Sequence, residues 1–289
     1  MTVAILAPAK INLGLEVLGK RDDGYHDIAT VFQSISIFDR LLLESSDRDE
    51  VRLIERPQQL EMNLAERALG VLRDTGHAIG HWNIQITKRI PMAAGLGGAS
   101  TDAAAVLVAL GRRSGIPAEV QEGLGLQLGS DVPFLISGGT ALAHGRGEQL
   151  SRLPSLRDCW FVLATPPLAL DRKTAQLYGA LQPADFTGGT RAGLVADDIR
   201  HGRIPAPSSL ANAFERPLRA LVPDITELER AFAAAGAPFV ALSGAGPTHY
   251  ALVPELSEAI SLASSLRTLL PRTTRIMIAR PTAFGPIVE

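Results

Sequence analysis

Three glycines within four residues stand directly before a run of alanine, valine and leucine. They are Gly95, Gly97 and Gly98, followed by the hydroxyl residues Ser100 and Thr101. Glycine allows positive φ and lets backbone N–H groups converge, and the start of a helix adds unpaired N–H groups with a partial positive charge. The pattern predicts a phosphate-binding loop. The alternative is a tight strand-to-helix connection that merely needs small residues.

The known phosphate loops differ in their spacing. The P-loop pattern G-x-x-x-x-G-K-[ST] is absent, because no Gly-Lys pair is followed by Ser or Thr. The dinucleotide pattern G-x-G-x-x-G fails at Ser100, which stands at the last glycine position. The His-Arg-Asp and Asp-Phe-Gly motifs of protein kinases are also absent. The pattern that remains is P-x-x-x-G-L-G-G-A-S-T.

Composition narrows the class of protein. The chain has 289 residues, of which 46% are hydrophobic and 20% charged, as in globular domains. Its 28 basic and 30 acidic residues predict no nucleic-acid partner and no attachment to an anionic membrane. Cys159 is the single cysteine, so no internal disulfide can form. With no apolar stretch near the roughly 20 residues of a membrane helix, we expect a cytoplasmic protein.

The elements that must position the loop follow an α+β order. In the first half, strand-like runs lie at 3–7, 11–18, 28–37, 40–45, 82–87, 134–136, 141–144 and 149–153, and helical runs at 63–74, 99–114 and 117–128. In the second half, strands are predicted at 159–165, 239–242, 249–253 and 274–279, and helices at 225–235 and 255–269. Residues 182–207 read as a loop region. The change of pattern near Pro154 predicts two domains, 1–153 and 154–289, the second resembling a split βαβ layer.

Four segments, in a fixed order along the chain, resemble the GHMP kinases, a family of small-molecule ATP kinases. They are PAKINLGLEVLGKRDDGYHDIATVFQSI (8–35), the glycine loop (91–101), LGSDVPFLISGGTALAHGRGE (128–148) and ALSGAGPTHYAL (241–252). The resemblance implies a two-domain fold: an N-terminal domain like ribosomal protein S5 domain 2, a ferredoxin-like C-terminal domain, and a ligand cleft between them. The first and third segments are most similar to the branch that phosphorylates a cytidylyl sugar alcohol in isoprenoid precursor synthesis.

The resemblance implies that Lys10 and Asp131 are the catalytic residues. Phosphoryl transfer to an alcohol requires the hydroxyl to lie in line with the γ-phosphate and its proton to be accepted. Asp131 would accept the hydrogen bond of the hydroxyl, and Lys10 would keep that carboxylate ionised and face the transferring group. From spacing alone, Asp131 reads as a helix cap or turn residue, and Lys10 as a solvated lysine at a strand edge.

ATP and Mg²⁺ are the implied cofactors. The loop predicted to bind ATP comprises Pro91, Met92, Ala93, Ala94, Gly95, Leu96, Gly97, Gly98, Ala99, Ser100 and Thr101. Two further residues, Asn63 and Lys88, match positions near the adenine. No protein residue is assigned as a metal ligand; Asp102 is the acidic residue beside Ser100 and Thr101.

The implied acceptor pocket combines aromatic and polar side chains. Tyr25 and His26 match residues that bind cytosine, Tyr178 a second stacking aromatic with Thr174 nearby, and Asn12 would contact the sugar-alcohol end. Without the resemblance, Tyr25 reads as a core aromatic and His26 as a surface histidine. The alternatives are a GHMP kinase for another alcohol, such as homoserine or a sugar, and a non-catalytic sensor on the same fold. The oligomeric state stays open between monomer and homodimer.

Overall fold

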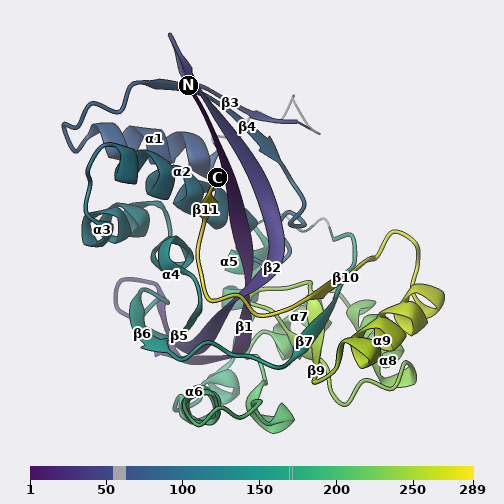
Figure 1. Ribbon diagram of the computed structural model, residues 1–289. Helices are drawn as coiled ribbons and strands as arrows, with labels where there is room; N and C mark the ends of the chain where they lie inside the picture. Colours follow the sequence, from purple (N-terminus) through teal and green to yellow (C-terminus); the bar gives the residue numbers. More distant parts are fainter. Residues whose placement is uncertain (55–62, 169, 171) are drawn as a thin grey trace.

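The computed structural model describes residues 1–54, 63–168, 170 and 172–289. Its described strands form two sheets (Figure 1). The first sheet has the order β11-β1-β2-β4-β3, with β5 paired to β2 and β6 paired to β5. Its strands are β1 (Thr2–Lys20), β2 (His26–Ser46), β3 (Glu50–Leu53), β4 (His81–Thr87), β5 (Thr140–His144), β6 (Gln149–Leu153) and β11 (Ile287–Val288). All pairs are antiparallel except β3 with β4.

Two long strands, β1 and β2, run through the centre of the molecule (Figure 1). The sequence predicts four separate strands here, which is wrong: 3–7 and 11–18 belong to β1, and 28–37 and 40–45 belong to β2. The apparent breaks lie next to a register shift at Pro8/Ala9, where the partner on β2 changes from Phe38 to Ile35. A further shift lies between Asn12 and Leu15. Bulges of this kind redirect the side chains of a strand. Lys10 and Asn12 therefore lie on a segment with irregular register at both of its ends.

Helices cover one face of this sheet (Figure 1). They are α1 (Leu64–Arg73), α2 (Gly98–Arg113), α3 (Ala118–Leu128) and α4 (Val132–Ser137). The predicted bounds of α1, α2 and α3 are confirmed to within one residue at each end. The predicted strand at 134–136 is wrong, because these residues belong to α4. Its whole run from Val132 to Ile136 is buried, so its apolar pattern does not separate a helix from a strand.

The second sheet has the order β10-β7-β9-β8 and is antiparallel. Its strands are β7 (Trp160–Thr165), β8 (Ala241–Leu242), β9 (His249–Val253) and β10 (Arg275–Ala279). The helices of this half are α5 (Lys173–Gly179), α6 (Thr190–Arg200), α7 (Glu215–Leu221), α8 (Ile225–Ala234) and α9 (Leu256–Leu269), with 3₁₀ turns η1 (Pro183–Asp185) and η2 (Pro207–Ser209). The predicted loop at 182–207 is wrong, because it contains α6, whose Val195 and Ile199 are buried.

The two sheets are joined by a shared core and by the end of the chain. Ile11 and Leu13 of β1 share one buried cluster with Phe161 of β7 and Tyr250 of β9. The Tyr250 hydroxyl donates to the Asn12 carbonyl at 2.9 Å. After β10 the chain returns to the first sheet, where β11 pairs with β1 and the C-terminus approaches the N-terminal half (Figure 1). This core fixes β1 against the second sheet.

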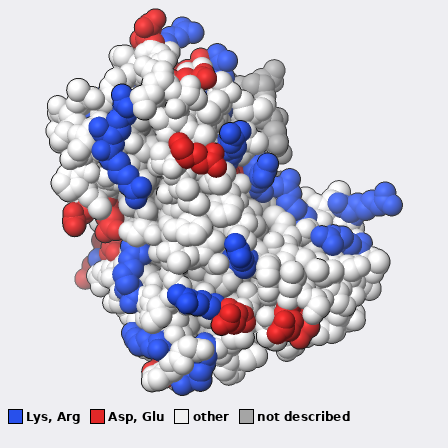
Figure 2. Space-filling model, in the orientation of Figure 1, with Lys and Arg blue, Asp and Glu red and all other residues white. Residues whose placement is uncertain are grey.

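Charged side chains of both signs are interspersed on the face shown in Figure 2. Within the residues that the structure describes, no helix has the length and apolar character needed to cross a membrane.

Candidate active site

The glycine loop connects the end of β4 to α2 through left-handed backbone. Gly95 and Gly97 have φ of +79° and +73°, and Ala93 also has a positive φ, +52°. The first i to i−4 bond of α2 runs from the Thr101 N–H to the Gly97 carbonyl at 2.8 Å. The N–H groups between them precede the intrahelical ladder and have no i−4 partner in the helix. This is the arrangement that binds anions at helix N-termini.

A second glycine-containing loop, residues 243–247, packs directly on the first. A Cβ on Gly95 would lie 2.2 Å from the Ser243 carbonyl oxygen, so only glycine fits there. The Ser243 hydroxyl donates to the Gly95 carbonyl at 2.9 Å. Lys173 of α5 joins the same two loops, donating to the carbonyls of Ala93 and Gly246. Burial lowers the pKa of Lys173 to about 8. Sequence reasoning missed Lys173, because nothing in its neighbourhood predicts contact with either loop.

Lys10 and Asp131 lie together beneath the glycine loop. The Lys10 ammonium is 3.3 Å from Asp131 Oδ2, 2.7 Å from Asn12 Oδ1 and 5.0 Å from the centre of the Phe32 ring. Lys10 is buried, whereas the Asp131 side chain is 33% exposed. Asp131 occupies the N-cap position of α4, but its side chain makes no capping bond. The carboxylate is thus paired with the ammonium and still open to a ligand.

Asn12 is buried, and both polar atoms of its amide are hydrogen-bonded within the fold. Its Oδ1 accepts from Lys10, and its Nδ2 donates to the Thr30 hydroxyl at 2.9 Å. These bonds orient Asn12 so that it holds the Lys10 ammonium in place. Its contact with the sugar-alcohol end stays a prediction.

Aromatic rings gather near Asp131. Tyr178 stacks on His26 with ring centres 4.7 Å apart and meets Phe214 edge-on at 4.8 Å. Burial and the negative charge of Asp131 raise the pKa of Tyr178 to about 12, so the phenol stays protonated near this carboxylate. The pKa of His26 is lowered by burial and by Lys20. The imidazole is therefore neutral over more of the physiological pH range.

Tyr25 lies at the rim of this group. Its side chain is 55% exposed, which rules out the reading of Tyr25 as a core aromatic. The Arg146 guanidinium lies 4.7 Å from the centre of its ring. Thr174, on α5, is exposed. The adjacent residues Tyr25 and His26, at the start of β2, therefore lie in the region of Tyr178 of α5, with His26 stacked directly on Tyr178.

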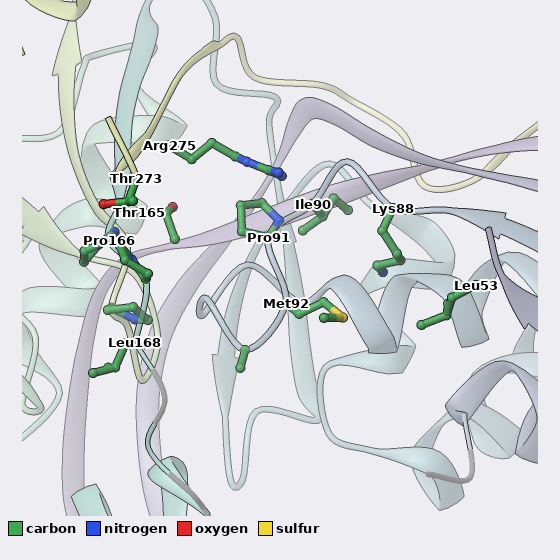
Figure 3. Close-up of a pocket in the computed structure, with 13 residues that line it drawn as sticks. Leu53, Lys88, Ile90, Pro91, Met92, Thr165, Pro166, Leu168, Thr273 and Arg275 are labelled. Carbon is green, nitrogen blue, oxygen red and sulfur yellow. The ribbon is translucent and has the colours of Figure 1, made fainter. Parts of the chain in front are cut away.

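A cavity of about 690 Å³ opens beside the glycine loop (Figure 3). Its walls carry three residues of the predicted ATP loop, Pro91, Met92 and Ala93, together with Lys88. Figure 3 shows Lys88 and Leu53 toward one end and Thr165 and Thr273 toward the other, from which the Arg275 side chain extends past Pro91. Asn63 is not among the lining residues that the structure describes; its Oδ1 caps α1 by accepting from the Ala65 N–H at 3.0 Å. Its place near the adenine stays a prediction.

The side-chain oxygens beside the glycine loop differ in whether they are free to bind a ligand. Thr101 is fully buried and its hydroxyl donates to the Pro8 carbonyl at 2.8 Å, so this hydroxyl does not face a phosphate. The place of Thr101 in the ATP loop stays a prediction. Asp102 is also buried and pairs with Lys88 at 2.6 Å. Ser100 is partly exposed in the same turn.

Asp102 should make the stability of the protein depend on pH. Burial raises its pKa from 3.8 to about 7, and Lys88 only partly opposes that effect. The folded protein therefore holds this proton more tightly than the unfolded chain. Its contribution to stability is complete below about pH 4 and is lost as the pH rises through about 7. In Asp102→Asn, the free energy of unfolding should fall less steeply between pH 4 and 8 than in the wild type.

Urea unfolding at a series of pH values measures this slope. The matched control is Asp47→Asn, since Asp47 is exposed, and its curve should run parallel to that of the wild type. A parallel curve for Asp102→Asn would contradict the assignment.

Comparison with known protein families agrees with this geometry. The GHMP kinases N terminal domain matches residues 63–139, and the GHMP kinases C terminal domain matches residues 195–272. The chain belongs to the GHMP kinase family. It is therefore an ATP-dependent kinase with the two-domain α+β fold that the motifs predict.

The kinase has curated relatives that match most of its length. A protein of Dehalococcoides mccartyi is 39% identical over 89% of this chain and 91% of its own, and one of Exiguobacterium sibiricum is 38% identical over 92% and 94%. Both are named 4-diphosphocytidyl-2-C-methyl-D-erythritol kinase.

Solved structures give the same fold. A crystal structure of 4-(cytidine 5′-diphospho)-2C-methyl-D-erythritol kinase superposes with a TM-score of 0.80 at 33% identity, covering 96% of this chain and 98% of that one. Homoserine kinase from Cytophaga hutchinsonii superposes with a TM-score of 0.76 at 18% identity, covering 100% and 97%, which supports the fold alone.

Proposed function

We propose that this kinase transfers the γ-phosphoryl group of ATP to the 2-hydroxyl of 4-diphosphocytidyl-2-C-methyl-D-erythritol, a step of isoprenoid precursor biosynthesis by the non-mevalonate route. The observation that carries the proposal is the position of the Lys10–Asp131 pair. Lys10 of this pair packs against Gly97 of the glycine loop. The negative charge of Asp131 contributes to the raised pKa of Tyr178, and Tyr178 stacks on His26. One carboxylate is thus placed between a phosphate-binding loop and rings suited to a nucleobase.

The reaction needs few protein groups. The substrate oxygen forms a bond to the γ-phosphorus while the bond from that phosphorus to the bridging oxygen of ADP breaks. Asp131 accepts the hydrogen bond of the attacking hydroxyl and takes its proton late, then releases it to water. Lys10, held by Asn12, faces the negative charge on the phosphoryl oxygens. Positioning and electrostatic stabilisation supply most of the rate in such transfers.

The residues at the loop fit Mg²⁺ brought in with ATP. Bound Mg²⁺ would neutralise charge on the phosphates. It usually keeps water and phosphate ligands and takes one or two protein oxygens. No cluster of three or more acidic, histidine or cysteine side chains suited to a metal occurs in the described part of the chain. Ser100 would hold the ion together with the phosphates, since the Thr101 hydroxyl is bonded within the fold.

The aromatic residues near Asp131 would bind the nucleoside end of the acceptor. Cytosine offers two faces for stacking and an exocyclic amine at its edge. Tyr25 and Tyr178 would supply the stacking surfaces, and His26 would hydrogen-bond the ring edge. Since Tyr178 and His26 are stacked on each other, cytosine binding would separate them or extend the stack on the side of Tyr25.

Product analysis tests the proposal. The protein is incubated with ATP and 4-diphosphocytidyl-2-C-methyl-D-erythritol, and ³¹P NMR locates the new phosphate. One phosphomonoester on the 2-oxygen, with stoichiometric ADP, is expected. Phosphorylation of homoserine or of a simple sugar in its place would refute the proposed acceptor while leaving the kinase assignment intact.

A further inference from the structure

Lys88 lies at the end of β4, directly beneath the start of α2, and its side chain is only 12% exposed. Its ammonium donates to Asp39 Oδ2, to Asp102 Oδ2 at 2.6 Å and to the Gly98 carbonyl at 3.2 Å. An ammonium has three N–H donors, and three acceptors use them all. In this arrangement Lys88 contributes to the cavity wall but has no N–H left for a nucleobase. Its positive charge is paired with the carboxylates of Asp39 and Asp102.

Asp39 of β2 holds the other end of the same loop. It is completely buried, and its Oδ1 accepts from the backbone N–H groups of Arg89 at 2.6 Å and Ile90 at 2.8 Å. These residues immediately precede Pro91, the first residue of the glycine loop. The carboxylate therefore fixes where the loop begins through Oδ1. Through Oδ2 and Lys88 it also fixes where the loop ends, at Gly98.

We infer that Asp39 and Lys88 are positioning residues that set the separation of the two ends of the glycine loop before nucleotide binds. A glycine-rich segment loses more conformational entropy on ordering than other sequences. If the ends of the loop are held in place before binding, the loop loses less conformational entropy when the phosphates bind. The affinity for ATP is then higher. The inference rests on the ATP-dependent activity and is independent of which alcohol is the acceptor.

Two variants test the contacts of Lys88 and those of Asp39 separately. Lys88→Met keeps the length of the side chain and removes the contacts to Gly98 and to both carboxylates. Asp39→Asn keeps an oxygen for the N–H groups of Arg89 and Ile90 but presents an amide to the Lys88 ammonium. Loss of preorganisation weakens binding, and a factor of ten in Kd corresponds to about 1.4 kcal/mol. We expect the Kd for ATP to rise about tenfold or more in Lys88→Met and less in Asp39→Asn.

Isothermal titration calorimetry measures both ligands. The Kd for the cytidylyl acceptor should change less than about threefold. Within the described part of the chain, the hydrogen-bond partners of the Lys88 and Asp39 side chains include none of the predicted acceptor residues. In Asp39→Asn/Lys88→Met, ATP affinity should be no weaker than in Lys88→Met, since the two residues act as one unit. Arg203→Met, which removes an exposed ion pair with Asp198, is the matched control and should bind ATP as the wild type does.

ATP binding within about threefold of wild type in both single variants would overturn the inference, as would an equal loss of affinity for ATP and acceptor. If Lys88→Met does not fold, Asp39→Asn carries the test, because it preserves side-chain volume and both backbone contacts. A wild-type protein that binds ATP but not the cytidylyl compound would refute the proposed acceptor. The ATP titrations would still decide the role of Asp39 and Lys88.

Discussion

Asp131→Asn is expected to bind both substrates but to turn over about 10²- to 10⁴-fold more slowly, the range typical of a lost general base. The amide has the same shape as the carboxylate, so the backbone of α4 and the loop should be undisturbed. It cannot take the proton of the hydroxyl and no longer forms an ion pair with the Lys10 ammonium, now 3.3 Å from Asp131 Oδ2. The loss should therefore appear in kcat and leave Kd nearly unchanged.

Steady-state kinetics combined with calorimetry measures this separation. Glu122→Gln is the matched control, because Glu122 also forms an ion pair, with Arg152 on the surface. Its kcat should equal that of the wild type. Activity of Asp131→Asn within about threefold of wild type would exclude a role for this carboxylate in proton transfer or hydroxyl positioning.

Gly97→Val should weaken ATP binding by at least about tenfold. Gly97 has φ of +73°, which costs a non-glycine residue about 1–3 kcal/mol and a β-branched one more. In addition, a Cβ there would lie 2.9 Å from Lys10 Cγ and 3.3 Å from Leu135 Cδ1. The substitution therefore strains the N-terminus of α2 and displaces Lys10, the proposed catalytic lysine. A decrease of at least about tenfold in ATP affinity is expected, since 1.4 kcal/mol corresponds to a factor of ten.

Gly70→Val provides the comparison within the same domain. Gly70 lies within α1, and a Cβ there would meet no atom within 4 Å. Valine is a better helix former than glycine, so folding should be unaffected or slightly improved. Normal ATP binding by Gly97→Val would contradict the assignment of the glycine loop to the phosphates.

The sequence predicts elements best where local signals agree. Helix α1 is predicted within one residue at each end, because Asn63 caps it and Leu69 and Leu72 follow helical spacing. Helix α4 is missed because its five consecutive apolar residues, Val132 to Ile136, carry no readable period. Strand β11 has two residues and exists only through pairing with β1 at the other end of the chain. Contacts that depend on the folded chain leave no local pattern.

The same distinction applies to the site. The glycine loop is visible in the sequence because its backbone requires glycine locally. The Lys10–Asp131 pair spans 121 positions and was predicted from family resemblance alone. Asp39 leaves no signal of burial in the sequence, because it lies between two predicted strands and is followed by Arg40, as an exposed turn residue would be. Its partners at Arg89 and Ile90 become apparent only in the folded structure.

The most direct test of the account compares kcat/KM for 4-diphosphocytidyl-2-C-methyl-D-erythritol with that for free 2-C-methyl-D-erythritol 4-phosphate, in the wild type and in Tyr178→Ala. Stacking contributes about 1–3 kcal/mol per base in nucleic-acid sites. The wild type should therefore prefer the cytidylyl compound by about 100-fold or more, and Tyr178→Ala should lose much of that preference without a change in KM for ATP. Equal phosphorylation of both acceptors by the wild type would contradict the cytidine pocket and the proposed function.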